Sequence, residues 1–408
     1  MYNLFQVFGV EMEYMIVDRQ TLNVKPIADL LIKAVEGEVV SETDQGELAW
    51  CNELVSHVIE LKTNGPAKDL SALTALFQRD VRRINQILEE FDACLMPTAT
   101  HPWMDPFKET KLWDHEYNEI YESFNKIFDC RGHGWANLQS THLNLPFAGD
   151  DEFGRLHAAI RAILPILPVL SASSPVMDAK VTGILDNRLA VYRTNAKRVP
   201  SVSGYVIPEP CYTEQAYRTE LLQKIYDDIA PLDPDGILQE EWLNARGAIA
   251  RFDRNAIEIR VLDLQEHPGA DIAILQFIIG VIKSLSESKW QDVEIIKQLD
   301  TIQLSTILTD TTEYGGETIL VWPDYLKVFG VGADSMPANQ LWMILFDQLE
   351  AEIWPEGDPS REIIKMILEK GNLSERIVRK LGKNPTKDDL FRVYDRLRVC
   401  LQEGIMLV

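Results

Sequence analysis

The feature of this sequence that most strongly indicates chemistry is a pair of glutamates at alternate positions of an apolar segment. Glu11 and Glu13 lie in FGVEMEYMIV, residues 8–17. Successive side chains of a strand point to opposite faces, so the two carboxylates share one face and apolar residues share the other. Like charges raise each other's pKa and are costly to desolvate, and a divalent cation offsets both effects. We therefore expect a metal site here, with the solvent face of an edge strand as the alternative.

The same alternation of polar side chains occurs in two later segments. His142 and Asn144 alternate in STHLNL, residues 140–145, and Glu258 and Arg260 alternate in IEIRVL, residues 257–262. Three such strands predict a sheet with one working face. An arginine on an acid-lined surface offers the permanent charge and forked donors that bind a phosphoryl group, although a same-face ion pair with Glu258 is the simpler alternative.

Two further acids, Glu53 and Glu60, bound the segment ELVSHVIE. They are seven residues apart, so a regular strand would send them to opposite faces. Either Glu53 precedes the strand or a bulge shifts the parity. Carboxylate oxygens suit Mg²⁺ or Mn²⁺ better than zinc. Four histidines without such a context are expected to be structural: His57, His115, His133 and His157. For His267, loop packing and a site role are equally open.

Composition narrows the range of partners. A net charge of -23 over 408 residues argues against nucleic acid and anionic membranes. Five scattered cysteines without a CxxC pair favour a reducing cytoplasm over disulfides or a zinc site. We expect no signal peptide at the N-terminus. The apolar region 158–177 contains an arginine and three prolines, so we expect no membrane span there. No P-loop or GxGxxG sequence occurs, so a bound nucleotide would depend on metals and arginines.

The remaining pattern predicts an α+β protein. Strands are expected near 5–18, 53–63 and 94–99 and around His142 and Glu258. Helices are expected after Pro26, at 68–92 with Asp69 or Ser71 as the cap, at 112–128, at 151–172 with a proline kink, and at 270–287. Residues 175–212 are expected to be rich in loops. The simplest organisation is a catalytic body over residues 1–290 with a mainly helical portion, 291–408, packed on it.

In this order, the segments resemble the glutamate–cysteine ligase superfamily, particularly its bacterial carboxylate–amine ligase branch. GVEME at 9–13 is similar to the family's opening strand, ELVSHVIE at 53–60 to its E-L-x-x-x-x-x-E segment, and Thr100-His101-Pro102 to its T-H-P loop. Further similarities are LSASSP at 170–175, YRT at 192–194 and IEIRVLD at 257–263. HLN at 142–144 stands where the carboxylate–amine ligases carry H-V-H and resembles some true glutamate–cysteine ligases, so both branches stay open.

The resemblance implies a fold like that of glutamine synthetase and the guanidino kinases, in which an antiparallel sheet forms a funnel flanked by helices. It implies an ATP-dependent ligase that makes an amide through an acyl phosphate. Carried over by position, the ligands of Mg²⁺ (or Mn²⁺) would be Glu11, Glu13, Glu53, Glu60, His142 and Glu258. Arg260, beside Glu258, would stabilise the transferring γ-phosphoryl group, and Arg193 would contact the nucleotide or a substrate carboxylate.

By family, L-glutamate is the leading acid and L-cysteine the leading amine. A homodimer is the expected protein assembly. Two other functions stay open: a metal-dependent phosphotransferase or hydrolase on the same fold, and a non-catalytic relative that binds a nucleotide or metabolite.

Overall fold

The protein is built around an eight-stranded antiparallel sheet. A computed structural model describes residues 1–408. The strand order is β2-β3-β4-β1-β6-β10-β9, and β5 pairs with the far end of β1. The bounds are β1 Gly9–Asp18, β2 Glu42–Asp44, β3 Leu48–Asn52, β4 Val58–Thr63, β5 Ala93–Met96, β6 Ser140–Pro146, β9 Ala248–Arg251 and β10 Ala256–Asp263. The protein is therefore α+β, as predicted.

One face of the sheet packs on long helices. Val10, Met12, Tyr14 and Ile16, the apolar half of the β1 alternation, are fully buried in the main core. This core also contains the apolar sides of α2 (Leu70–Leu88), α6 (Gly149–Ile163) and α11 (Pro268–Ser286). Asp69 caps α2 by accepting a hydrogen bond from the Ser71 N–H, which confirms one of the two predicted caps.

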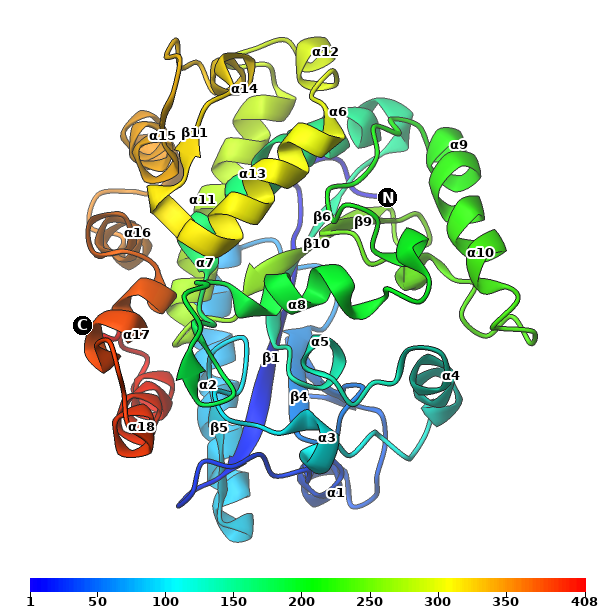
Figure 1. Ribbon diagram of the computed structural model, residues 1–408, viewed down its shortest axis with the longest axis vertical. Helices are drawn as coiled ribbons and strands as arrows, with labels where there is room; N and C mark the ends of the chain where they lie inside the picture. Colours follow the sequence, from blue (N-terminus) through cyan, green and yellow to red (C-terminus); the bar gives the residue numbers. More distant parts are fainter.

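The opposite face of the sheet is divided in two along β1. Its first half carries Glu11 and Glu13, and its second half carries Met15 and Val17. These apolar residues form a second core with β5 and the C-terminal helices α17 (Leu373–Leu381) and α18 (Lys387–Glu403). Over the polar half lie α4 (Asn118–Phe128), α5 (His133–Ala136) and α8 (Asn187–Asn195), as Figure 1 shows. A single strand therefore supplies both a packed face and a face left open to a ligand.

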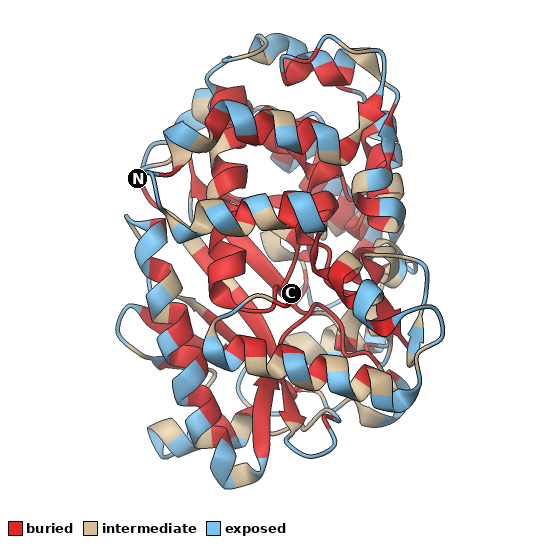
Figure 2. Ribbon diagram, turned by 90° about the vertical axis from the view of Figure 1, so that its left-hand side faces the viewer, coloured by how far each residue is buried: buried red, intermediate tan, exposed pale blue.

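The region after residue 290 is mainly helical and shares the main core. Besides α17 and α18, its helices are α13 (Thr301–Tyr314), α15 (Ala338–Ile353) and α16 (Pro359–Lys370), with short α12 (Val293–Ile296) and α14 (Pro323–Val328). Trp342 of α15 is fully buried and donates to the Ile166 carbonyl oxygen. Figure 2 shows the buried sheet enclosed by helices whose outer sides are exposed.

Short elements connect these layers. They are α1 Ala28–Glu36, α3 Pro106–Glu109, α7 Pro168–Ser171, α9 Glu214–Ala216, α10 Gln223–Ile229 and the two-residue strands β7 Val176–Met177, β8 Lys180–Val181, β11 Ile319–Leu320 and β12 Met336–Pro337. A 3-10 turn over Leu164–Ile166 separates α6 from α7, so the predicted kink at the prolines is confirmed.

Boundary predictions were wrong at two places, and one helix inside the loop-rich stretch was not predicted. The strand expected near 53–63 begins at Val58, and Glu53 lies in the loop between β3 and β4, so the alternative in which Glu53 precedes the strand is confirmed. The helix expected from residue 112 begins only at Asn118. The stretch 175–212 contains the helix α8, which Asp186 caps through the Leu189 N–H. The α8 sequence NRLAVYRTN has few apolar residues, so no helical stripe revealed it.

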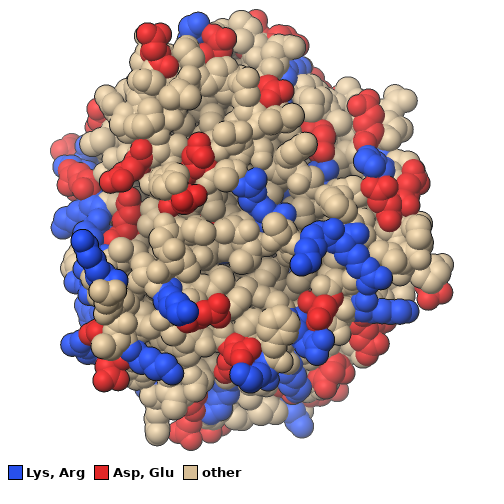
Figure 3. All heavy atoms as spheres, viewed as in Figure 1, with Lys and Arg blue, Asp and Glu red and all other residues tan.

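One helix, α11, is long and apolar enough to cross a membrane, but 83% of its most apolar window is buried inside the protein. It is the central helix of the core. On the face shown in Figure 3, Lys and Arg groups lie among Asp and Glu, so the excess negative charge forms no continuous acidic field there.

Candidate active site

The strand register gathers the predicted acids on one face. Glu11 pairs with His142 of β6, and Glu13 pairs with Glu60 of β4. Directly paired residues of antiparallel strands share a face, and their Cβ atoms are about 5 Å apart. Glu258 of β10 pairs with Asn144, one strand further on. Three strands, β4, β1 and β10, therefore present carboxylates to the same space, and β6 adds the imidazole of His142.

His142 is the centre of this cluster. Its Nδ1 atom lies 2.9 Å from Glu11 Oε2 and 3.6 Å from Glu258 Oε1, and its Nε2 atom lies 3.9 Å from Glu13 Oε1. Ser140 Oγ donates to Glu13 Oε2 at 2.9 Å and lies 2.9 Å from His142 Nε2. Two overlapping sets of ligand atoms result, Glu11/His142/Glu258 and Glu13/Glu60/His142, each with its atoms within 4.8 Å of one another.

The charges of these groups are poorly balanced without a cation. Burial alone would raise the pKa of Glu11, but the hydrogen bond and charge of His142 lower it to about 2. Burial together with the Glu11 and Glu53 charges raises the pKa of Glu60 well above its ordinary value. Burial and the Glu13 charge raise the pKa of Glu53 to about 7. A buried carboxylate set in which Glu53 and Glu60 resist ionisation, and which offers mostly oxygen atoms and one imidazole, fits a hard divalent ion such as Mg²⁺ or Mn²⁺.

Cys51 also belongs to this site, although its position in the sequence gave no indication of it. It pairs with Glu60 across β3 and β4, and its Sγ donates to Glu60 Oε1 at 2.8 Å. Burial and the Glu60 charge raise the pKa of Cys51 well above its ordinary value, so it remains a thiol donor.

A β-bulge in β10 sets the direction of Arg260. The register runs from Ile259 opposite Leu143 to Leu262 opposite Thr141, so Arg260 and Val261 together oppose His142. A bulge of two residues against one shifts the alternation by one position. Arg260 therefore shares the acidic face with Glu258. Beyond the bulge, Leu262 faces the core and Asp263 lies on the acidic face.

Arg260 carries the cationic part of the site. Its Nε atom lies 2.8 Å from Glu258 Oε1. Burial disfavours its charge, but Glu258 and other nearby acids outweigh this and raise the pKa of Arg260. Arg251 of β9, which sequence reasoning missed, approaches the other oxygen of Glu258 at 3.6 Å.

Glu13, Glu53, His142 and Arg260 line one cavity of about 370 Å³. Glu11, Glu60 and Glu258 contact or adjoin these residues. The opposite wall is apolar and aromatic, and its half-buried rings are Tyr121, Phe124, Trp135 and Trp242. The Phe124 ring centre lies 5.4 Å from Trp135 and 5.8 Å from Trp242. An apolar pocket with a few convergent charged groups is the usual form of a small-molecule site.

Arg193 is not brought into this cavity. It lines a different one, of about 360 Å³, and its guanidinium donates to Thr309 Oγ1. Arg188, five residues earlier on α8, lines the acidic cavity instead. The sequence signal that could have identified it is its position two residues after the α8 cap.

Structural roles belong to three of the histidines and to two serines of the segment LSASSP. His57 and His157 are buried, and burial lowers the pKa of each to about 3. His267 caps α11 by accepting from the Gly269 N–H. Ser173 and Ser174, in the segment LSASSP, bind Asp263 Oδ2.

Comparison with known proteins defines the class. The family model described as glutamate–cysteine ligase family 2 (GCS2) matches residues 7–314. The chain belongs to this family, whose ligases are ATP-dependent carboxylate–amine ligases.

Individual relatives are distant. An uncharacterized protein of Archaeoglobus fulgidus is 29% identical over 98% of this chain and 99% of its own length. A protein of Cronobacter sakazakii, provisionally named glutamate–cysteine ligase 2, is 23% identical, and the alignment spans 45% of this chain and 46% of that one. The crystal structure of a glutamate–cysteine ligase of Francisella tularensis in complex with AMP has a TM-score of 0.61 and 14% identity, and the match covers 97% of this chain and 89% of that one. This likeness shows the shared fold.

Proposed function

We propose that the protein is an ATP- and Mg²⁺- (or Mn²⁺-) dependent ligase that joins a carboxylic acid to an amine through an acyl phosphate. L-Glutamate is the proposed acid, giving a γ-glutamyl amide, and L-cysteine is the leading amine. The observation that carries the proposal is the cluster of five carboxylates, one imidazole and Arg260 at a single cavity.

The reaction requires such a cluster. Phosphorylating a carboxylate with ATP brings several anionic oxygens together, and fixed positive charges must offset their repulsion. The residues that would hold the cations are Glu11, Glu13, Glu53, Glu60, His142 and Glu258. When bound, divalent ions supply charge neutralisation and orient the phosphates.

Arg260 supplies the remaining positive charge. Its Nε atom faces Glu258, and neither of its terminal nitrogens hydrogen bonds to a protein group, so both can donate to an oxygen of the transferring phosphoryl group. The half-buried aromatic wall excludes water from the opposite side, which protects an acyl phosphate from hydrolysis.

The test is ADP formation by the purified protein. ATP and Mg²⁺ are combined with a panel of acids and amines, beginning with L-glutamate and L-cysteine, and both ADP and the amide are measured. The proposal predicts ADP release that requires acid and amine together and equals the amide formed. ADP without amide would favour the phosphotransferase or hydrolase alternative. Thermal stabilisation by ATP and Mg²⁺ without any turnover would favour a binding protein.

A further inference from the structure

The backbone carbonyl oxygen of Arg260 lacks its usual hydrogen-bond donor in the neighbouring strand. Its N–H donates to the Gly247 carbonyl oxygen at 2.9 Å. In a regular antiparallel pair, the Gly247 N–H would return a bond to the Arg260 carbonyl. It donates instead to the Val206 carbonyl oxygen at 2.7 Å. The Arg260 carbonyl oxygen thus receives no hydrogen bond from Gly247 at the bulge from which Arg260 projects.

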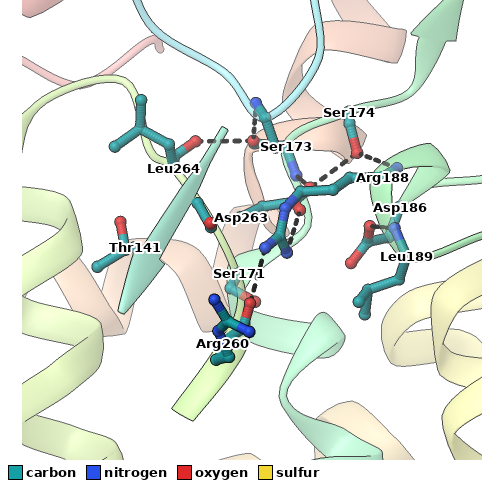
Figure 4. A network of polar contacts seen from close by, with 12 residues as sticks. Thr141, Ser171, Ser173, Ser174, Asp186, Arg188, Leu189, Arg260, Asp263 and Leu264 are labelled. Atoms are coloured by element: carbon teal, nitrogen blue, oxygen red, sulfur yellow. Dashed lines mark hydrogen bonds and ion pairs between the residues drawn. The ribbon is translucent and has the colours of Figure 1, made fainter. Parts of the chain in front are cut away.

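Arg188 supplies the missing bond. Its Nη2 atom donates to the Arg260 carbonyl oxygen at 2.7 Å. The Arg188 side chain is only 3% exposed, and its Nη1 atom lies 3.6 Å from Asp263 Oδ1. Figure 4 shows the Arg188 guanidinium between Asp263 and Arg260.

Asp263 is itself fixed on the other side. Its Oδ2 atom accepts from the Ser173 N–H at 2.9 Å and from Ser174 Oγ at 2.8 Å, and the Arg188 N–H donates to Ser174 Oγ at 3.2 Å. A chain of contacts thus runs from the end of α7 through Asp263 and Arg188 to the bulge. Bulges near active sites re-aim side chains, and they need such support to keep one conformation.

We propose that Arg188 is a positioning residue for Arg260. By completing the hydrogen bonding of the bulge, it holds the Arg260 guanidinium in the direction of the acidic cavity. Its Nε and Nη1 atoms have no hydrogen-bond partner, although they are buried. Unsatisfied buried donors of this kind cost stability, which favours a role for Arg188 beyond folding. The kinetic part of the test rests on the proposed ligase function.

The decisive experiment is a double-mutant cycle between Arg188→Met and Arg260→Lys in the full-length protein. A misplaced catalytic group can lower a rate about 10²-fold, so Arg188→Met should lower kcat by about that factor and change the KM for ATP little. In the Arg260→Lys background, Arg188→Met should lower kcat by no more than about twofold, because the forked donor is already lost. A difference of this size is within the scatter found for independent sites. The positioning role would be contradicted if the two single losses of kcat multiplied in the double variant. It would also be contradicted if Arg188→Met raised only the KM for ATP.

Two further variants control for a loss of activity that is caused only by misfolding. Arg188→Met leaves Asp263 buried without its partner, so the pair Arg188→Met/Asp263→Asn is measured alongside and should show the same loss of kcat. Arg198→Met removes an exposed arginine that also donates to backbone carbonyls, those of Lys126 and Ile127, and should behave as wild type.

Hydrogen exchange separates this inference from the proposed function. In Arg188→Met, the peptide covering residues 256–263 should exchange faster than in wild type, and α18 should be unchanged. Unchanged exchange at 256–263 would overturn the inference even for an active enzyme. If the wild-type protein forms no ADP with any substrate, the proposed function fails, whereas the exchange result still decides the role of Arg188.

Discussion

Glu60 lies among carboxylates that cannot all ionise without a cation. Burial and the Glu11 and Glu53 charges raise its pKa well above the ordinary value, so they favour its protonated form. Gln resembles that neutral form in size and shape. Glu60→Gln should therefore keep or raise the thermal stability of the metal-free protein while lowering ADP formation about 10²-fold or more, as for loss of a preorganised charge-binding group.

Glu11→Gln and Glu13→Gln should lower activity by a similar factor. Glu11→Gln should not raise stability, because His142 lowers the pKa of Glu11 and stabilises its ionised form. Glu90→Gln, at an exposed position away from the cavity, is the matched control and should change neither quantity. A Glu60→Gln variant with full activity and unchanged Mg²⁺ dependence would contradict the proposed role of the cluster.

Arg260→Lys tests the forked donor directly. Lysine keeps the charge but loses the planar fork, so kcat should fall more than the KM for ATP rises. The measurement is steady-state ADP release at varied ATP. A change in KM alone would make Arg260 a ground-state binding residue.

Proton binding at Glu53 predicts a pH dependence of metal binding. In the folded protein the pKa of Glu53 is about 7, above its ordinary value of 4.5. Between these values the folded state holds a proton that the unfolded state has lost, so this group's contribution to stability falls as pH rises through the window. A divalent ion must displace that proton. The increase in melting temperature on adding Mg²⁺ should be larger at pH 8 than at pH 6, and an equal or smaller increase at pH 8 would be inconsistent with carboxylate ligation.

At the scale of elements, the helix α18 supports the strand that carries the acids. Leu397 is fully buried in the second core, where α18 covers Met15 and Val17 of β1. Leu397→Ala should lower the free energy of unfolding by about 2–5 kcal/mol, the usual range for a buried leucine. Denaturant titration measures the loss, and Arg392→Ala on the exposed side of α18 is the control. Equal effects of the two substitutions would show that α18 contributes little to this core.

The elements also show what sequence patterns could reveal. Alternation correctly predicted β1, β6 and β10, because strand geometry alone puts residues i and i+2 on one face. It could not predict the bulge at Arg260, since a shift of register depends on the neighbouring strand. It also missed α8, because a helix over a polar cavity has no continuous apolar stripe, and with α8 it missed Arg188.

At the scale of the whole molecule, the chain has a net charge of -23, whereas the proposed function requires it to bind anionic substrates. The arginines at the cavity, Arg188 and Arg260, are each paired with an acid, so little free positive charge remains to attract ATP. Divalent ions would resolve this conflict, and the sequence predicted both the cluster and the conflict. The aromatic wall could not be foreseen, because Tyr121, Trp135 and Trp242 come from segments distant in sequence.

The most direct test of the central claim follows one oxygen atom. The acid substrate is labelled with ¹⁸O in its reacting carboxylate and incubated with enzyme, ATP, Mg²⁺ and the amine. If the carboxylate attacks the γ-phosphorus, one of its oxygens bridges carbon and phosphorus and leaves with phosphate when the amine forms the amide and loses a proton. The account predicts one ¹⁸O atom in each phosphate released, together with ADP and amide. Unlabelled phosphate, or AMP with pyrophosphate in place of ADP, would contradict it.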